Sequence, residues 1–177
     1  MKKSALAGTA AVHVTAGLVS AHTSIGRKKN HAKLAKMEEV AVGWLINLLR
    51  FPSSCGGALC SGATIACTTA LCAARDKVLA ETGWDVRLHG LCGAPAIHIY
   101  VGPCAHSSVF KALPIVGLGS SAAPPHFTVF PALPNGAVDA EALLSLSVPP
   151  PSGPAIVFLQ AGHVKTGAFD DFPVVIA

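Results

Sequence analysis

The chain has 177 residues, of which 51% are hydrophobic and only 12% are charged. That length suits one domain with a sizeable core, and that composition excludes an intrinsically disordered protein. The formal net charge of +4 is partly local, because five basic residues fall within ten positions: Arg27, Lys28, Lys29, Lys33 and Lys36. No aromatic residues alternate with this run, so a solvated helix start is favoured over a nucleic-acid surface.

Residues 1–32 are expected to form a poorly determined leader. Met1-Lys2-Lys3 and the small residues up to Ala21 have the outline of a secretion signal, but Gly8 and His13 weaken its hydrophobic segment. No window approaches ~18 uninterrupted apolar residues, so the sequence predicts no membrane span.

From Lys36 onward, helices and strands are predicted to alternate. Apolar residues from Met37 to Leu48 follow helical spacing, and Pro52 marks the end of that helix. A loop over 53–62 precedes a second helix from about Thr64 to Ala80. A later helix begins near Ser107 and is kinked or ended by Pro114, and Asp139 is placed to cap another over Ala140–Leu146.

Three short apolar runs, rich in β-branched and aromatic residues, are predicted to be strands: 96–101, 127–130 and 155–159. The third is apolar throughout, as a sheet covered on both faces requires. Strands alternating with helices predict an α/β fold with a mainly parallel sheet flanked by helices. The expected core includes Trp44, Leu45, Leu48, Ile97, Ile99, Val101, Ile156 and Phe158.

The six cysteines do not have the spacing of a metal site. Cys55 and Cys60, and likewise Cys67 and Cys72, are separated by four residues rather than the two typical of zinc knuckles. On a helix, Cys67 and Cys72 differ by about 140° around the axis. Buried, reduced thiols are the favoured interpretation, and they indicate a cytoplasmic location.

A Gly-rich turn, Ser61-Gly62-Ala63-Thr64, opens directly onto the second helix. The backbone N–H groups of a helix start and the helix dipole together favour a bound phosphate. Gly62 and Ala63 leave room for close approach, and Thr64 adds a hydroxyl donor. An ordinary helix cap explains the same pattern.

Two further segments follow predicted strands. His106 comes after the first strand, at the carboxyl end of the sheet, where α/β folds build their sites and an imidazole can lie against an aromatic cofactor ring. The alternative is that His106 has no cofactor role and is a loop histidine whose hydrogen bonds are made to neighbouring residues. The second segment, 160–171, contains His163 between two glycines. Its Asp170 and Asp171 are expected to cap or anchor the next helix rather than act as acids or bases.

Taken in order, these segments resemble the group II decarboxylases, which depend on pyridoxal 5′-phosphate (PLP) and include the glutamate and aromatic-amino-acid decarboxylases. The resemblance covers roughly residues 33–172. Each motif alone is weak evidence for the family, but their occurrence together in the family's order is specific. The matching stretches are Lys36-Met-Glu-Glu-Val, Trp44-Leu, Ser61-Gly-Ala-Thr-Ile-Ala66, Ala73-Ala-Arg75, Gly83-Trp-Asp-Val86, Gly90-Leu-Cys-Gly-Ala-Pro95, His106-Ser-Ser-Val, Lys111-Ala-Leu, Gly117-Leu-Gly119 and Gln160-Ala-Gly with Thr166-Gly-Ala-Phe-Asp170.

The resemblance implies that residues 33–177 form the N-terminal part of a large domain of the aminotransferase-like fold type I. It also implies PLP as the cofactor, with Ala63 and Thr64 at its phosphate and His106 stacked on its pyridine ring. His163, in the third motif, joins these cofactor-binding residues. The implied activity is that of a lyase acting on an amino acid, either glutamate or aspartate or an aromatic one. The implied assembly is a homodimer, with neither a nucleic-acid nor a membrane partner.

The chain also departs from the family pattern. Cys67, His163 and Lys165 stand where the family favours Asn, and Pro114 falls within a helix that the family keeps regular. The family's His-Val-Asp segment and its Schiff-base lysine would lie beyond Ala177, and neither Lys111 nor Lys165 sits in the right motif to replace that lysine.

Two hypotheses remain open. In the first, the sequence is a truncated PLP-dependent carboxy-lyase with no catalytic residue of its own. In the second, it is a non-catalytic shortened relative, or a gene remnant, that acts at most as a cofactor-binding or interaction module. PLP chemistry needs both the lysine and a carboxylate at the ring nitrogen, so either hypothesis leaves this chain with cofactor binding at most.

Overall fold

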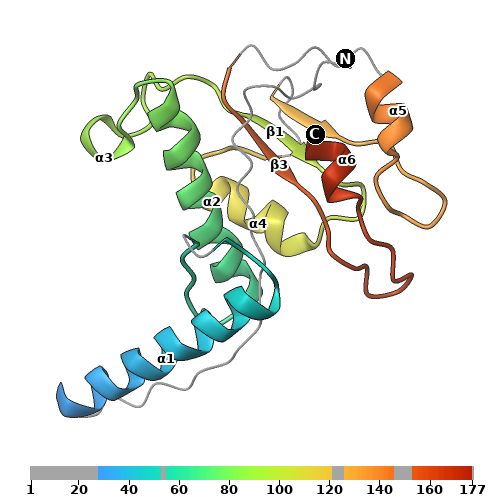
Figure 1. Ribbon diagram of the computed structural model, residues 1–177. Coiled ribbons are helices and arrows are strands. Elements are labelled where there is room, and N and C mark those ends of the chain that lie inside the picture. The colour runs from blue at the N-terminus through green and yellow to red at the C-terminus, as the bar shows by residue number, and fades with distance from the viewer. Residues whose placement is uncertain (1–27, 53–54, 121–125, 146–152, 177) are drawn as a thin grey trace. The chain divides into compact units, whose positions relative to one another are not determined.

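The computed structural model describes residues 28–52, 55–120, 126–145 and 153–176. Helices and strands alternate along most of these ranges (Figure 1). Contacts between Cα atoms divide the chain into two compact units, with the boundary between Ala66 and Cys67, inside the second helix.

The first unit contains helix α1, Lys28–Leu48, which begins well before the predicted apolar stripe and ends before Pro52 as expected. Its end is closed by Phe51, whose backbone N–H donates to the carbonyl of Ile46 at 3.0 Å. Arg50 has a φ of 56° at this point, so the helix ends with a left-handed residue. The loop that follows is tied back to α1, since the backbone N–H of Leu59 donates to Oε1 of Glu38 at 2.9 Å.

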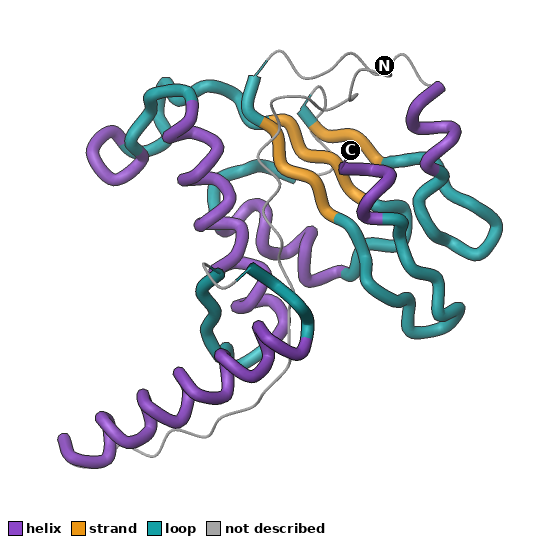
Figure 2. Tube along the Cα trace, viewed as in Figure 1, coloured by secondary structure: helices purple, strands orange, loops and turns teal. Residues whose placement is uncertain are grey.

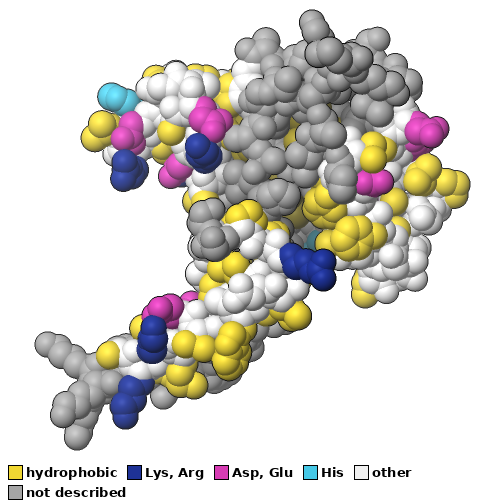
Figure 3. All heavy atoms as spheres, in the orientation of Figure 1, with side chains coloured by type: hydrophobic (Ala, Val, Ile, Leu, Met, Phe, Trp, Pro, Cys, Tyr) yellow, Lys and Arg dark blue, Asp and Glu magenta, His cyan; other side chains and the backbone are white. Residues whose placement is uncertain are grey.

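The apolar stripe of α1 is not part of the core, contrary to prediction. Trp44 and Leu48 are 71% and 75% exposed, and Leu45 is exposed as well. Hydrophobic side chains are visible along this helix in Figure 3. Helical spacing predicts a face that favours burial, but burial also needs a facing surface, which the spacing does not supply.

The second unit is built on a three-stranded parallel sheet, shown in Figure 2. Its strands are β1, His98–Val101; β2, Phe127–Val129; and β3, Ala155–Phe158. The spatial order is β2-β1-β3, with Ile99 opposite both Phe127 and Ile156. The predicted parallel α/β sheet is therefore confirmed.

Helices cover both faces of this sheet (Figure 1). On one side, α2 (Ala63–Glu81) and α4 (Ser107–Ile115) pack over Ile99, Val101 and Ile156. On the other side, Tyr100 and Ala155 pack with Phe130, Val138 and Val175. Short helices α5 (Ala140–Ser145) and α6 (Phe172–Ile176) lie on that side. Alternation along β1 explains the two cores, because successive side chains of a strand point to opposite faces.

The core predicted for the sheet is largely correct. Ile97, Ile99, Val101 and Ile156 are buried, and Phe158 is half-buried against the same cluster. Helix α4 begins at Ser107, and Pro114 lies in its last turn, where the helix ends. Asp139 caps α5 as predicted: its Oδ1 accepts from the backbone N–H of Ala142 at 2.9 Å.

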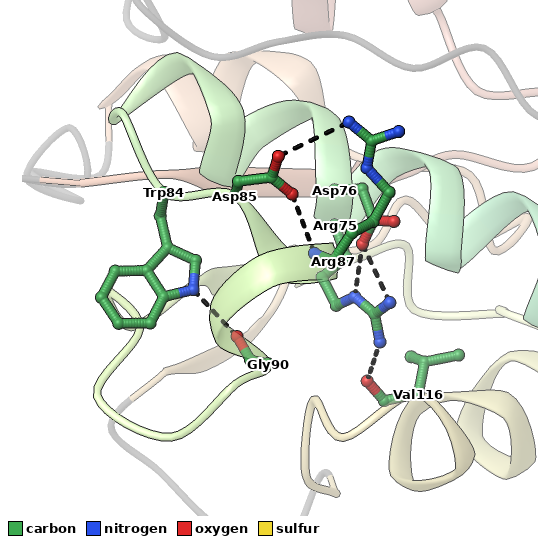
Figure 4. A network of polar contacts seen from close by, with 7 residues as sticks. All are labelled: Arg75, Asp76, Trp84, Asp85, Arg87, Gly90 and Val116. Atoms are coloured by element: carbon green, nitrogen blue, oxygen red, sulfur yellow. Dashed lines mark hydrogen bonds and ion pairs between the residues drawn. The ribbon is translucent and has the colours of Figure 1, made fainter.

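Arg75 joins α2 to the end of α4. Its Nη1 donates to the backbone carbonyl of Val116 at 2.8 Å, and its Nε donates to Oδ1 of Asp76 at 2.9 Å (Figure 4). The Arg75 side chain is only 14% exposed, whereas Asp76 is 43% exposed. Arg75 therefore has a structural role, since it satisfies a carbonyl at the end of α4.

A four-residue helix, α3 (Val86–His89), follows α2 and was not predicted. Asp85 caps it by accepting from the backbone N–H of Arg87 at 2.9 Å, and this bond is the main reason that the pKa of Asp85 is lowered. Trp84 closes the turn beyond it, with Nε1 donating to the carbonyl of Gly90 at 2.9 Å (Figure 4). Side-chain bonds of this kind, rather than helical periodicity, define so short a helix.

All six cysteines lie in described residues, and none forms a disulfide. The expectation that they are buried holds fully for Cys67 and is wrong for Cys92, which is exposed; the other four, Cys55, Cys60, Cys72 and Cys104, are half-buried. Cys67 lies on α2 within the buried core cluster, whereas Cys92 lies in the turn before β1 with its side chain exposed.

Candidate functional site

The Gly-rich turn opens α2 as predicted. Ala63 and Thr64 are the first two residues of the helix, and both are half-buried. The first turn carries no acidic residue, and the backbone N–H of Ala66 closes it by donating to the carbonyl of Gly62 at 3.0 Å. A Cβ on Gly62 would meet no atom within 4 Å. The helix start is therefore open beside Gly62 and free of negative side chains.

His106 is the N-cap of α4, at the end of the loop that follows β1. Its backbone is extended (φ −65°, ψ 146°), and its ring nitrogen Nδ1 accepts from the backbone N–H of Ser108 at 3.2 Å. A side-chain acceptor at this position satisfies a donor of the first helical turn, a task usually done by Ser, Thr, Asp or Asn. The side chain is exposed while its Nδ1 is held.

Behind His106 lies a buried polar contact that the sequence reading missed. The hydroxyl oxygen of Ser108 is 2.9 Å from Nδ1 of His106 and 3.4 Å from Sγ of Cys67. Both Ser108 and Cys67 are buried. The only hint in the sequence is a serine two residues after a helix-capping histidine, because Cys67 lies 41 residues away from Ser108.

His163 lies in a tight turn after β3. Its backbone N–H donates to the carbonyl of Ala168, and its own carbonyl accepts from Gly167, each at 2.8 Å. Nδ1 of the ring accepts from the backbone N–H of Thr166 at 3.3 Å and lies 3.0 Å from the Thr166 hydroxyl. Gly167 has a φ of 68°, which lets the turn close.

The structure places His106 and His163 at the same end of the sheet, the end where the parallel strands finish. Each follows the carboxyl end of one of two adjacent parallel strands, β1 and β3, and those ends are joined by the backbone N–H of Gly102 donating to the carbonyl of Phe158 at 3.0 Å. No hydrogen bond joins the two rings in the described chain. Ala63 and Thr64 precede the boundary between the two compact units.

Asp170 anchors this end of the sheet. It is only 3% exposed, its Oδ2 accepts from the backbone N–H of Gln160 at 2.7 Å, and its Oδ1 accepts from the backbone N–H of Val138 at 2.9 Å. A Cβ on Gly102 would lie 3.1 Å from Oδ2, so a larger residue at this position would press on the carboxylate. Asp171 is exposed and caps α6 by accepting from Val174 at 3.2 Å. Both have the anchoring and capping roles that the sequence predicted.

A second group of titratable side chains lies at the opposite end of the sheet. Nε2 of His98 is 2.8 Å from the hydroxyl of Thr128, and the ring lies 4.5 Å from that of Tyr100, between centroids. Burial lowers the pKa of His98, and the nearby ring of His126 lowers it further. Burial alone raises the pKa of Tyr100. His98 is the first residue of β1, whereas His106 follows the carboxyl end of that strand, so His98 is not part of the proposed set.

Two negative findings hold for the described residues. No three His, Cys, Asp or Glu side chains gather there in a way that would hold a metal ion. None of the helices described combines the length and apolar character needed to cross a bilayer.

No protein-family model matches the chain, but solved structures do. Mouse CSAD in its apo form superimposes with a TM-score of 0.69 at 24% identity, over 87% of this chain and 31% of that one. The glutamate decarboxylase domain of a Vibrio parahaemolyticus diaminobutyrate-pyruvate transaminase and L-2,4-diaminobutyrate decarboxylase gives 0.70 at 22% identity, over 84% and 33%. Oryza sativa TDC with PLP and tryptamine gives 0.64 at 25% identity, over 83% and 31%.

The chain thus spans about a third of the length of the solved structures it matches. The structural likeness covers most of this chain and agrees with the order of its motifs. The chain has the fold of part of the large domain of the PLP-dependent group II decarboxylases, the family that its sequence motifs resemble.

Proposed function

We propose that this chain supplies part of the cofactor-binding layer of a PLP-dependent carboxy-lyase that acts on an amino acid, and that it binds PLP without a covalent bond. One observation carries the proposal: an exposed histidine caps α4 at the carboxyl end of β1, in a fold shared with a TDC structure that contains PLP. The carboxyl ends of parallel strands are where open α/β sheets bind their ligands.

The start of α2 fits the phosphate of PLP. A dianion is stabilised by the dipole and backbone N–H groups of a helix start, and acidic side chains there would oppose it. The first turn of α2 has no acidic residue, and there is open space beside Gly62. We assign the phosphate to Ala63 and Thr64, with the Thr64 hydroxyl as a further donor.

His106 fits the pyridine ring. Its side chain is exposed, while the bond to the backbone N–H of Ser108 fixes where the imidazole sits. A flat, immobilised ring stacks at a smaller entropic cost than a mobile one. His163, on the neighbouring loop, completes the proposed set, and the Thr166 contacts hold its ring in place.

Bound PLP supplies an electron sink for the carbanion left when an amino acid loses its carboxylate. The residues described here bind and orient, but none is placed to do chemistry on a substrate. Lys111 is exposed on α4 and Lys165 is exposed in the turn that holds His163, and neither lies in the family's lysine motif. We therefore expect the 177-residue chain alone to release no carbon dioxide from amino acids. The amino-acid substrate and a homodimeric assembly remain proposals for the whole protein.

The second candidate function is a non-catalytic cofactor-binding or interaction module. It is favoured by three polar departures from the family pattern near the proposed site: Cys67, His163 and Lys165. Carbon dioxide release on adding the missing family segments, in one chain or as a second chain, supports the enzyme. PLP binding that persists without activity in that longer protein supports the module.

Pyridoxine 5′-phosphate is the sharpest probe, because it has the phosphate and ring of PLP but no aldehyde to react with lysines. Calorimetry should show binding of one molecule per chain, and pyridoxine without phosphate should bind much more weakly. H106A should weaken binding by roughly three- to tenfold through lost stacking, whereas H89A, in an exposed helix, should not. Equal affinities for the wild type and H106A would contradict the proposal.

A further inference from the structure

Two buried polar side chains are not used by the proposed cofactor contacts. Ser108 is 5% exposed and Cys67 is 6% exposed, and their Oγ and Sγ atoms are 3.4 Å apart. The same Ser108 oxygen lies 2.9 Å from Nδ1 of His106. Buried polar groups are normally placed so that each donor meets an acceptor, so the direction of these bonds can be worked out.

The direction follows from the backbone. The N–H of Ser108 can only donate, and it points at Nδ1 of His106 at 3.2 Å, so Nδ1 carries the lone pair rather than a proton. The Ser108 hydroxyl beside the same nitrogen must then also donate to it. Its oxygen keeps lone pairs for an incoming donor, and the only group that the described structure offers there is the Cys67 thiol.

We propose that Ser108 and Cys67 are positioning residues for His106. The Cys67 S–H donates to the Ser108 oxygen, and the Ser108 O–H donates to Nδ1 of His106. This relay holds the imidazole as the tautomer with its proton on Nε2 and fixes the orientation of the ring. The relay stands on the geometry of this chain alone, whereas its consequence for PLP rests on the proposed function.

The relay also links two elements of the fold. Cys67 lies on α2, one helical turn after Thr64, and Ser108 lies in the first turn of α4. In this relay the Cys67 thiol donates its hydrogen bond inside the apolar core that α2 and α4 share, and the bond connects the two helices. A thiol is a weak donor, and a serine hydroxyl at position 67 would serve the same purpose more strongly.

Nitrogen-15 NMR of histidine-labelled protein tests the first step, with the His106 signals assigned from H106A. The ring should show a protonated Nε2 and an unprotonated Nδ1 at neutral pH. A protonated Nδ1 in the wild type would overturn the relay. In S108A the His106 signals should move towards those of a solvent-exposed, mobile histidine. The control is S107A, which alters the exposed neighbouring serine and should leave the His106 signals unchanged. Equal shifts in the two variants would also overturn the proposal.

The thiol step has its own measurement, which does not depend on S108A being folded. The infrared S–H stretching band of Cys67, isolated by subtracting the spectrum of C67A, should lie at the lower frequency of a hydrogen-bonded thiol. A band at the free-thiol frequency would remove Cys67 from the relay. C67S should keep the His106 signals of the wild type, whereas C67A should shift them, because only serine restores a donor.

The link to the cofactor is measured separately. S108A should weaken binding of pyridoxine 5′-phosphate by roughly three- to tenfold, since it removes one of the two hydrogen bonds to Nδ1 and so loosens the His106 ring. If the NMR result holds but S108A binds the ligand as the wild type does, the ring's positioning has no role in binding and that part of the proposal is wrong. If the wild type does not bind the ligand at all, the proposed function fails while the relay stands.

Discussion

Oδ1 of Asp170 accepts a 2.9 Å hydrogen bond from the backbone N–H of Val138, which lies 32 residues earlier in the chain. The other carboxylate oxygen, Oδ2, accepts from Gln160 at 2.7 Å, at the end of β3. One buried side chain therefore joins the loop after β3 to the segment that precedes α5. This contact defines the end of the sheet that carries the loop of His163.

The buried carboxylate should be important for stability. D170N keeps the shape of the side chain but turns one acceptor into a donor, so one backbone N–H is left facing another donor. We expect the free energy of unfolding to fall by about 2–3 kcal/mol. Urea denaturation followed by circular dichroism measures it.

The neighbouring aspartate provides the matched control. Asp171 is exposed and caps α6, and Asn is as good a cap as Asp, so D171N should change stability by no more than about 0.5 kcal/mol. Similar losses in D170N and D171N would show that the two buried hydrogen bonds contribute little.

Arg75 should not be replaceable by lysine. A lysine has a single ammonium group and cannot at once reach the Val116 carbonyl and pair with Asp76 as the guanidinium does. R75K should lower the free energy of unfolding by about 1–2 kcal/mol. R87K is the control, because the Arg87 side chain is 86% exposed and its pair with Asp85 is long, at 3.5 Å; a change within about 0.5 kcal/mol is expected. A larger loss in R87K than in R75K would contradict this assignment.

Stability should depend on pH through His98. Burial and His126 lower its pKa in the folded state below the ordinary value of 6.5, so the unfolded chain binds the proton more readily. The stabilising contribution is complete above pH 6.5 and is lost as the pH falls through 6.5 towards the lower folded pKa. Denaturation between pH 5 and pH 8 should show this fall in the wild type and a smaller one in H98Q. H89Q, which alters an exposed histidine, is the control and should show the same fall as the wild type. If stability falls as steeply with pH in H98Q as in the wild type, the pH dependence comes from a group other than His98.

Much of the sheet layer could be predicted because its signals are local. Strands β1 and β3 are short apolar runs, α2 follows a Gly-rich turn, and Asp139 marks the start of α5. Burial of α1 was predicted wrongly from the same kind of signal, since periodicity defines an apolar face but says nothing of what covers it. Trp44 shows the difference most clearly, because it is at the centre of the predicted stripe and yet exposed.

The places of the candidate residues in the secondary structure were predictable, but the contacts around them were not. His106 was recognisable from its place between a strand and a helix, and it indeed caps α4. The contact from Ser108 to Cys67 joins positions 41 residues apart, and no local pattern announces it. The short helix α3 was missed for a similar reason, because side-chain bonds from Trp84 and Asp85 define it.

Covalent trapping addresses the expected lack of a reactive lysine. After PLP is added, borohydride reduction fixes any lysine that has condensed with it, and peptide mapping locates the product. The label should be substoichiometric and spread over exposed lysines such as Lys33 and Lys36, with no carbon dioxide released from added amino acids. A single pyridoxyl-lysine at one per chain, together with carbon dioxide release, would show a complete active site.

The central proposal, which rests on the resemblance to the family, is that the start of α2 and the ring of His106 bind one cofactor. Protein NMR with pyridoxine 5′-phosphate tests it most directly. The account predicts that the ligand shifts the amide signals of Ala63 and Thr64, and that its ring protons show nuclear Overhauser effects to the ring of His106. Shifts confined to the basic positions of α1, with no contact between the ligand and His106, would contradict it.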